Sequence, residues 1–446
     1  MKKTFFALLA VCMALTACNP QNDKGGTQYK LADPADIVMY QVNPRVFAPS
    51  NSLNAVVARI DSIQALGVNT LWIMPIFPIG TTKTKNSPYS ISDYQDVAPE
   101  FGTLDDYKNL VKVAHSKGLA VIQDWVPNHT SWDHPWIKEH PEWYTHDAEA
   151  DTIICPQGPG WDWTDVADLN YDNKDLRAAM TSAMKFWITE VGLDGFRCDV
   201  ADFVPVDFWK DAIAELRQAA GNRKIVMLSE GKRPDNFSVG GFDMNYGWDY
   251  KDSLVNVFKK GYPVSFLFEA DKAEYAPLGP GNYKMRFTTN HDHSVEATPP
   301  VEFTNERGAM AAYVASIYPH GGALIYSSQE VGHPTPISFF HYVPVDWNAN
   351  PQIYQEYQKL IALYNEYPAL RSKGKLTPYP DRDIMLFEKS DDNVRILVAV
   401  NVRNEVKSIA IPTEWQGKVT NLTSGKDFTL GEMLELKPFE YLISKK

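Results

Sequence analysis

Near the middle of the chain the sequence reads Leu193-Asp194-Gly195-Phe196-Arg197-Cys198-Asp199-Val200. A turn-forming Asp-Gly pair opens this stretch, and side chains of different character then alternate, which is typical of a β-strand. The period of two places Gly195, Arg197 and Asp199 on one face and Phe196, Cys198 and Val200 on the other. A guanidinium beside a carboxylate favours the ionised acid, so the pattern predicts a lowered pKa for the Asp199 carboxyl. Taken alone, such an ion pair is more often structural than functional.

Short apolar strands of this kind recur along the chain, and amphipathic segments with a helical period separate them. Predicted strands cover residues 37–47, 68–76, 119–126, 195–200, 224–230, 242–248, 285–289 and 323–327. Predicted helices cover residues 52–66, 103–117, 174–191, 205–220, 251–260, 306–317 and 351–366. Strand–helix units with right-handed crossovers, repeated to this number, predict an α/β fold with a closed (β/α)8 TIM barrel.

Two parts of the chain break this rhythm. Residues 127–170 are rich in Trp, His, Pro and Gly and show no period, which predicts a loop domain inserted after the third strand. Residues 377–446 contain short alternating runs between turn residues, which predicts a C-terminal antiparallel β-sandwich domain. We therefore assign residues 34–376 to the barrel, with the loop domain as an insertion within it.

The N-terminus carries a predicted export signal. Basic residues precede a short apolar run, and residues 1–17 end directly before Cys18. The pattern resembles a bacterial lipoprotein signal. This resemblance implies cleavage before Cys18, a lipid on its sulfur, and an exported protein on the periplasmic or surface face of the outer membrane. The alternative is a secretory peptide followed by a chance cysteine. Residues 18–33 are polar and predict a flexible tether.

Composition narrows the classes of partner. The chain is 44% hydrophobic and 12% aromatic, which is enough for a large core. Its formal net charge of −12 argues against a nucleic acid partner, because phosphates would be repelled, and it fits an uncharged ligand. Beyond the signal and Cys18, Cys155 and Cys198 have no spacing typical of a zinc site or a disulfide framework.

Polar side chains recur where the predicted strands end. The strand ends read Asp124-Trp125-Val126-Pro127-Asn128-His129, Arg197-Cys198-Asp199, Ser229-Glu230 and Thr289-Asn290-His291-Asp292. In a TIM barrel the carboxyl ends of all strands meet at one rim, and chemistry is located there. The recurrence predicts a single site at that rim, and it makes a purely structural role for the Arg197–Asp199 pair the weaker interpretation.

These segments, in this order, resemble the four sequence motifs of the α-amylase family, glycoside hydrolase family 13. The stretches Tyr40-Gln41-Val42-Asn43-Pro44-Arg45 and Ser327-Ser328-Gln329-Glu330 resemble further segments of that family. The resemblance implies a retaining hydrolase of α-1,4 glucosidic bonds, with α-1,6 bonds left open, in starch-derived or maltooligosaccharide substrates. It makes Asp199 the nucleophile, Glu230 the general acid/base and Asp292 the transition-state stabiliser.

Each role places a chemical demand on its side chain. Asp199 must be ionised to attack the anomeric carbon, and the Arg197 guanidinium is expected to keep it so. Glu230 must hold a proton for the leaving oxygen, so its pKa must be raised by apolar walls and nearby negative charge. Carboxyls about 5–5.5 Å apart would give a covalent glycosyl-enzyme and net retention.

The resemblance also assigns supporting residues. Family residues that bind or position the sugar in the first subsite correspond to Tyr89, His129, Arg197, His291 and Asp124. Asn128 and Asp168 correspond to ligands of a calcium ion that joins the inserted domain to the barrel in many members. The alternative is that both hydrogen-bond loop backbone. No organic cofactor is implied. Stacking on glucan rings and forming the core of the inserted domain are both expected among Trp132, Trp136, Trp143, Trp161 and Trp163.

Close to the nucleophile and the acid, the chain departs from the common family pattern. Asp202 stands where Lys is frequent, Phe203 where His is frequent, and Lys232 where Trp is frequent. The run 200–202 is closer to the neopullulanase and cyclomaltodextrinase branch, so bond preference stays open. Two other functions stay open as well: an α-glucan transglycosylase on the same scaffold, and a glucan-binding lipoprotein without activity. Silent relatives lose one or more of the three carboxylates, which are all present here. The sequence does not indicate an oligomeric state.

Overall fold

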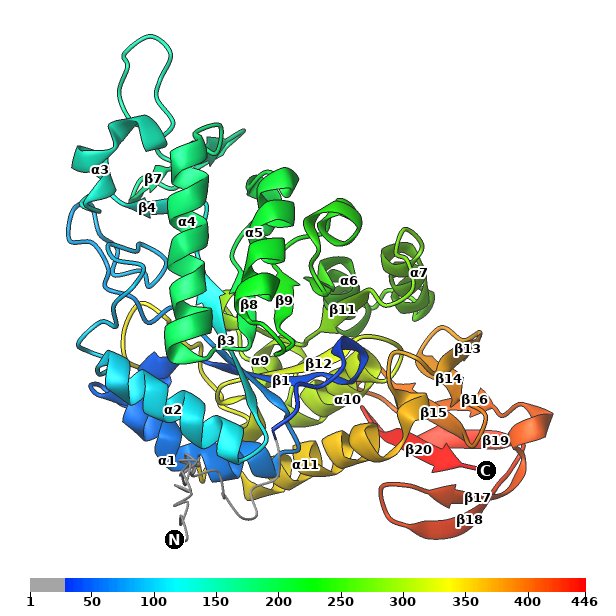
Figure 1. Ribbon diagram of the computed structural model, residues 1–446. Coiled ribbons are helices and arrows are strands. Elements are labelled where there is room, and N and C mark those ends of the chain that lie inside the picture. The colour runs from blue at the N-terminus through cyan, green and yellow to red at the C-terminus, as the bar shows by residue number, and fades with distance from the viewer. Residues whose placement is uncertain (1–28) are drawn as a thin grey trace, which may run out of the picture.

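The computed structural model describes residues 29–446, so the predicted signal, Cys18 and most of the tether lie outside the described residues. Parallel strands close into a barrel in the order β1-β12-β11-β10-β9-β8-β3-β2 (Figure 1). These strands are β1 (Val38–Val42), β2 (Thr70–Ile73), β3 (Ala120–Trp125), β8 (Gly195–Cys198), β9 (Val226–Ser229), β10 (Met244–Tyr246), β11 (Tyr283–Arg286) and β12 (Gly322–Tyr326). The predicted (β/α)8 barrel is confirmed.

Helices form the outer layer of the barrel, and several begin after a residue whose side chain accepts a hydrogen bond from a backbone N–H of the first turn. The longer ones are α1 (Ser52–Ala65), α2 (Leu104–Ser116), α4 (Lys174–Phe186), α5 (Val206–Ala219), α6 (Trp248–Lys260), α7 (Ser265–Tyr275), α10 (Glu306–Ile317) and α11 (Pro351–Glu366). The single-turn helices are α3 (Trp136–Glu139), α8 (His291–Ser294) and α9 (Pro299–Glu302). At the start of α2, Thr103 and Asp106 form a capping box, which satisfies backbone N–H groups of the first turn.

Strand β8 separates two apolar layers. Phe196 and Cys198 lie in the core between strands and helices, whereas Arg197 points into the barrel, 5.0 Å from the ring centre of Trp72. The predicted alternation is therefore correct for these residues. It is wrong for Val200, because the strand ends at Cys198 and Val200 turns into the left-handed region with φ of 37°. Val200 instead lines a cavity at the rim.

Gly195 lets β8 and β9 approach each other. Its φ is +139°, and a Cβ placed there would lie 1.8 Å from the Val226 carbonyl oxygen. A side chain at this position would therefore force the two strands apart. Close backbone contact between β8 and β9 is what brings the ends of these strands, and the acids that follow them, side by side.

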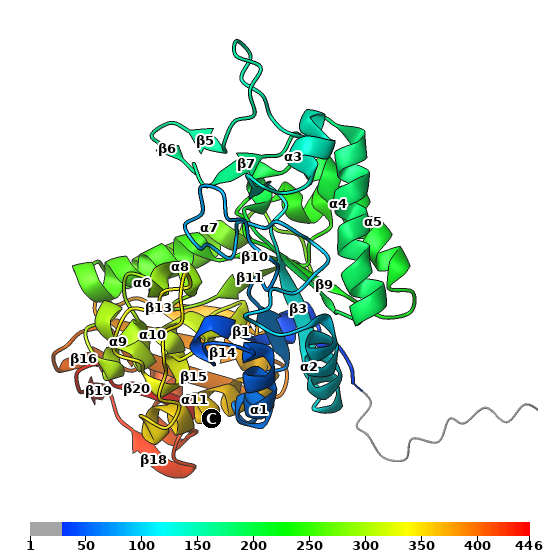
Figure 2. The ribbon, with the colours of Figure 1, turned by 90° about the vertical axis from the view of Figure 1, so that its left-hand side faces the viewer.

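The inserted segment after β3 forms a protrusion above the rim (Figure 2). Its backbone is held by two short antiparallel pairs. In one, β4 (His129–Ser131) pairs with β7 (Val166–Asp168), and in the other, β5 (Gln157–Gly158) pairs with β6 (Trp161–Asp162). Trp143 is buried in this region, while Trp161 is 38% exposed, so the tryptophans do divide between core and surface.

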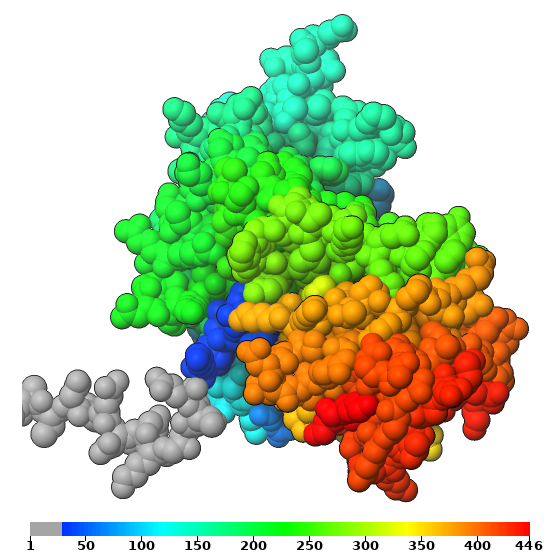
Figure 3. Space-filling model, turned by 90° about the vertical axis from the view of Figure 1, so that its right-hand side faces the viewer, coloured from blue at the N-terminus to red at the C-terminus, as the bar shows by residue number. Residues whose placement is uncertain are grey.

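The C-terminal domain is antiparallel and lies against the side of the barrel (Figure 3). Its larger sheet has the order β13 (Lys375–Tyr379), β14 (Ile384–Ser390), β15 (Arg395–Asn401), β20 (Tyr441–Lys445), β17 (Gly417–Asn421) and β18 (Lys426–Leu430). A smaller sheet pairs β16 (Lys407–Ala410) with β19 (Met433–Leu436). Within residues 29–446, no helix has the length and apolar character that a membrane crossing needs.

Candidate active site

Strand register brings the predicted site residues together at the rim. In the β3–β8 pair Asp124 lies opposite Arg197, and in the β8–β9 pair Cys198 lies opposite Ser229. Asp199 and Glu230 each follow directly after these strands, so their backbones are neighbours: Glu230 N donates to the Cys198 carbonyl at 2.9 Å. One ladder of parallel strand pairing thus brings together Asp199 and Glu230, which are about thirty residues apart in the sequence.

Arg197 lies at the centre of the site and is fully buried. Its guanidinium nitrogens lie 2.8 Å from Asp124 Oδ1, 2.9 Å from Asp199 Oδ1 and 2.9 Å from Glu230 Oε2. The first two contacts are hydrogen bonds, whereas the contact to Glu230 is an ion pair without hydrogen-bond geometry. A single guanidinium therefore contacts three carboxyl groups, and it hydrogen-bonds to Asp124 and Asp199 but not to Glu230.

The strained turn at Val200 aims a donor at Glu230. Val200 is β-branched and has φ of 37°, a conformation that such residues rarely adopt. Its backbone N–H donates to Glu230 Oε2 at 2.8 Å. This bond fixes the orientation of the Glu230 carboxyl toward the cavity, and it would be lost if Val200 continued the strand.

Burial sets the proton affinities of the central acids. Burial is the largest effect on Asp199 and raises its pKa to about 7, although Arg197 pulls the pKa downward. The predicted lowering of the Asp199 pKa is therefore wrong: removal of water outweighs a guanidinium that is shared with other acids. Burial, together with the charges of Asp199 and Asp292, raises the pKa of Glu230 to about 8. The raised pKa of Glu230 is in the predicted direction and leaves it the better proton holder.

The Tyr89 and His291 rings lie together in the cavity lining, and Asp124 lies behind them. The Tyr89 ring stacks on His291 at 5.3 Å, and its hydroxyl donates to Asp124 Oδ2 at 3.1 Å. Gln41 Nε2 lies 2.8 Å from His291 Nδ1, which makes Nδ1 the acceptor and leaves the proton on Nε2. Burial lowers the pKa of His291 to about 4, so the ring is neutral near pH 7. His291 Nε2 lies 3.3 Å from Asp292 Oδ1, which places Asp292 beside these two rings.

His129 also lines the cavity, at the start of β4 in the inserted domain. Burial lowers the pKa of His129 to about 4, so it too is neutral near pH 7. Its ring contacts Trp163 edge-on, with ring centres 5.5 Å apart. A neutral histidine beside a tryptophan provides a hydrogen-bonding group and an apolar face, which suits an uncharged polyol.

The acids open into a cavity of about 400 Å³ at the rim, and side chains that sequence reasoning missed complete it. Lys85, Asp165, Phe339 and Phe340 line it together with Tyr89, His129, Trp163, Asp199, Glu230, His291 and Asp292. Lys85 Nζ lies 3.0 Å from Asp165 Oδ1. These four come from irregular loops, where no period or motif indicates which way a side chain faces. The nearest signal was the position of Lys85 four residues before Tyr89.

Asn128 and Asp168, the predicted calcium ligands, lie at the base of the inserted domain. The Asn128 carbonyl oxygen accepts from Leu169 N at 3.1 Å, and its amide nitrogen lies 3.3 Å from His129 Nδ1. Burial raises the pKa of the Asp168 carboxyl. Within residues 29–446, the side chains of His, Cys, Asp and Glu form no group of three or more with metal-binding geometry. Calcium at this place stays a prediction, and we derive no step through the ion.

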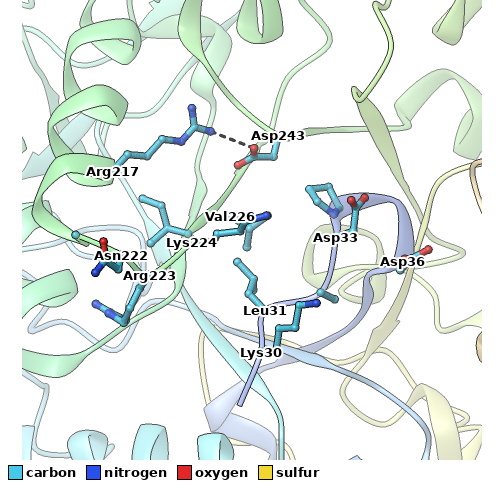
Figure 4. Close-up of a pocket in the computed structure, with 14 residues that line it drawn as sticks. Lys30, Leu31, Asp33, Asp36, Arg217, Asn222, Arg223, Lys224, Val226 and Asp243 are labelled. Atoms are coloured by element: carbon cyan, nitrogen blue, oxygen red, sulfur yellow. Dashed lines mark hydrogen bonds and ion pairs between the residues drawn. The ribbon is translucent and has the colours of Figure 1, made fainter. Parts of the chain in front are cut away.

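Larger cavities lie elsewhere, and Asp199, Glu230 and Asp292 do not line them. One of about 780 Å³ is found where strands begin, at the end of the barrel opposite the rim (Figure 4). There Arg217 donates to Asp243 at 3.1 Å, and Lys30, Leu31 and Arg223 face the same space. Another of about 870 Å³ lies between α7 and β13. The rim cavity is the candidate active site because the perturbed carboxyls converge there.

Residues 41–231 match the family model described as "Alpha amylase, catalytic domain". Among curated proteins, the chain is 26% identical over 415 residues to "Alpha-amylase MalA" of Haloarcula japonica, which covers 88% of this chain and 58% of that protein. It is 30% identical over 258 residues to "Alpha-amylase 3" of Dictyoglomus thermophilum, which covers 52% of this chain and 47% of that protein. The chain thus spans about half the length of these relatives.

A solved structure agrees with the fold and the match. An α-amylase from Lactobacillus plantarum superposes with a TM-score of 0.82 at 26% identity, covering 93% of this chain and 99% of that one. Barrel, insertion and C-terminal domain are all included in an overlap of this extent. The matched catalytic domain and the named relatives together support a glycoside hydrolase.

Proposed function

We propose that the chain is a retaining α-glucan hydrolase that cleaves α-1,4 bonds in starch-derived or maltooligosaccharide substrates, with action on α-1,6 bonds left for the pullulan assay below to decide. One observation supports this most: Asp199 and Glu230 contact the same buried guanidinium, at a cavity that Asp292 also lines. Two carboxyls of unequal proton affinity facing one space is the arrangement that glycoside hydrolysis requires. Their separation of about 5–5.5 Å stays a prediction.

The roles follow from the surroundings of each acid. With the higher pKa, Glu230 donates its proton to the glycosidic oxygen, while ionised Asp199 attacks the anomeric carbon and the C–O bond breaks. The products of this step are a glycosyl ester on Asp199 and a released shorter glucan, whose former glycosidic oxygen is now a hydroxyl group. Glu230, now ionised, removes a proton from water, which attacks the same carbon and frees Asp199 with net retention. Val200 N–H stabilises the ionised form of Glu230 between the two steps.

Side chains of the cavity lining orient the sugar for this chemistry. Neutral His129 and His291 offer ring N–H groups to hydroxyls, and Tyr89 offers an apolar ring face. Asp292 is 44% exposed at its side chain, so it can reach a bound sugar and balance the positive charge that develops on the ring. Transfer to a sugar hydroxyl in place of water would make the same scaffold a transglycosylase.

The test uses the chain from residue 29 onward, with maltooligosaccharides and pullulan followed by chromatography. We expect shorter sugars, and we expect Asp199→Asn to lower kcat by about 10⁴-fold or more, because an amide is not a nucleophile. Asp211→Asn, at an exposed carboxyl on α5, is the matched control and should retain activity. Longer products would indicate the transglycosylase, and unchanged sugars would favour a binding protein. Wild-type turnover in Asp199→Asn would refute the assignment of the nucleophile.

A further inference from the structure

Three segments close the rim cavity on one side. Lys85 and Tyr89 belong to the loop after β2, Asp165 belongs to the inserted domain, and Phe339 and Phe340 belong to the loop after β12. We call these residues the wall. The Lys85–Asp165 ion pair, at 3.0 Å, joins two of the segments. The Phe339 and Phe340 rings stack at 4.4 Å, and Phe339 packs edge-on against Tyr89 at 5.8 Å.

A buried arginine also braces the wall from behind. Arg45 is only 3% exposed, and its Nη1 donates to the carbonyl oxygens of Asn86 at 2.8 Å and Phe339 at 2.9 Å. Glu100 holds the same guanidinium at 2.6 Å. The Asn86 amide in turn donates to the Phe340 carbonyl oxygen. A buried arginine thus fastens the loop after β2 to the loop after β12.

Strand order places the wall opposite the proposed acid. Around the closed barrel, β1 is four strands from β9 in either direction, and β2 and β12 flank β1. Glu230 follows β9, so two of the three wall segments, the loops after β2 and β12, arise on the far side of the barrel from it. The acid protonates the leaving oxygen, so the leaving group must lie on the β9 side. The wall therefore lies on the side of the sugar unit whose anomeric carbon is attacked, away from the leaving group.

Two exposed aromatic rings lie near the end of β8, the strand beside β9. Trp161 is 38% exposed and Phe203 is 54% exposed, and their rings stack at 5.7 Å with an angle of 8° between planes. Phe203 lies in the turn after β8, the strand next to β9. Large apolar rings are usually buried, so an exposed stacked pair beside a sugar site indicates a surface for further sugar rings.

We propose that this site takes the free non-reducing end of an α-glucan and cleaves from that end, an inference that rests on the proposed hydrolase function. In an α-glucan, every unit beyond the cleaved one on the retained side leads toward the non-reducing end. The wall stops the chain in that direction, and the cavity of about 400 Å³ is near the small end of the range for ligand pockets. The remainder of the chain extends over Trp161 and Phe203.

The test compares two maltoheptaosides that differ at one end. One has a free non-reducing end, and the other has that end blocked by a 4,6-O-ethylidene group; chromatography measures the cleavage of both. We expect the blocked substrate to be cleaved at least about tenfold more slowly. Lys85→Ala and Phe340→Ala should bring the ratio of the two rates toward one, because each opens the wall. Lys83→Ala is the matched control: Lys83 lies in the same loop over the Trp132 ring, outside the cavity lining, and should keep the wild-type ratio.

The outcomes separate this inference from the function on which it rests. Equal rates for both substrates in the wild-type protein would overturn it while leaving the hydrolase in place. The inference would also be overturned if the wild-type protein cleaves the blocked substrate slowly but the ratio of the two rates is the same in Lys85→Ala and Phe340→Ala. If neither maltoheptaoside is cleaved, the hydrolase proposal fails and this inference fails with it.

Discussion

At the scale of single residues, the site is a crowded set of acids with too little positive charge. Asp124, Asp199 and Glu230 all contact Arg197, and Asp292 lies nearby without such a contact. Burial raises the pKa of Asp124 to about 7, as it does for Asp199. One proton shared among such neighbours is the expected state near neutral pH, and unequal burial and bonding decide which acid holds it.

This crowding predicts a narrow pH profile. Asp199 attacks only when ionised, so kcat/KM should fall as pH drops through about 7. Glu230 donates only when protonated, so kcat/KM should fall as pH rises through about 8. Initial rates on a maltooligosaccharide between pH 4 and 10 measure both limbs. An acidic limb near 4, the ordinary range of a carboxyl, would contradict the raised pKa of Asp199.

A variant checks the cause of the acidic limb. The charge of Asp124 helps to raise the pKa of Asp199, so Asp124→Asn should move the acidic limb to lower pH. The alkaline limb should move less, because the charges of Asp199 and Asp292 remain and raise the pKa of Glu230. Asp202→Asn changes a neighbouring rim carboxyl that binds backbone N–H groups, and it should leave both limbs in place.

Sequence reasoning reached the carboxyls but not their balance. Motifs and strand ends indicated Asp199, Glu230 and Asp292, because strands of a parallel barrel must end at one rim. The pKa of Asp199 was missed, because a sequence shows that Arg197 is near but not that other acids share it or that water is absent. Lys85 and Phe340 were missed because their loops have no period that links position to direction.

At the scale of elements, the contact between β8 and β9 positions the two catalytic candidates. It depends on Gly195, where a Cβ would meet the Val226 carbonyl oxygen at 1.8 Å. The turn at Val200 then follows, and both features are local exceptions to strand geometry. The alternating pattern predicted β8 correctly up to Cys198. It failed at Val200, where the backbone leaves the strand and its N–H donates to Glu230.

Gly195→Ala should therefore destabilise the protein strongly, by more than about 3 kcal/mol, because the methyl group cannot fit without separating the strands. Gly192→Ala is the matched control: Gly192 also has a positive φ, +84°, but a Cβ there would meet nothing within 4 Å. Its cost should be about 1 kcal/mol, the strain of a left-handed backbone alone. Urea unfolding compares the two, and equal midpoints would show that the close contact does not limit stability.

At the scale of the whole molecule, the C-terminal domain and the barrel share one core. Phe387, Val398 and Phe439 of the domain belong to the same buried cluster as Phe258 and Tyr318 of the barrel. Lys389 is fully buried and donates to the carbonyl oxygens of Arg371 at 3.1 Å and Gly374 at 3.0 Å. The sequence predicted a separate antiparallel domain from its change of period, but period alone does not indicate which strands pack on a neighbour.

A second tie joins the domain to the helix layer. Arg403 donates from Nε to Asp383 at 2.8 Å and from Nη2 to the Tyr262 carbonyl oxygen at 2.7 Å, and its Nη1 donates to the Val257 carbonyl oxygen in α6. The guanidinium therefore bonds within its own domain and across to the barrel at once. Folded domains that are joined by a shared core and buried bonds are expected to unfold together, unlike domains on a flexible linker.

We therefore expect one thermal transition for the barrel and the C-terminal domain. Leu397→Ala tests this, because Leu397 is fully buried in the second core of the domain, which the barrel residues do not join. The cavity should cost about 2–5 kcal/mol and lower the midpoint of the single transition. The midpoint of heat inactivation should fall by the same amount, although Leu397 does not line the rim cavity. Two separate calorimetric transitions, with hydrolysis surviving the first, would show that the domain is only attached to the barrel and does not stabilise it.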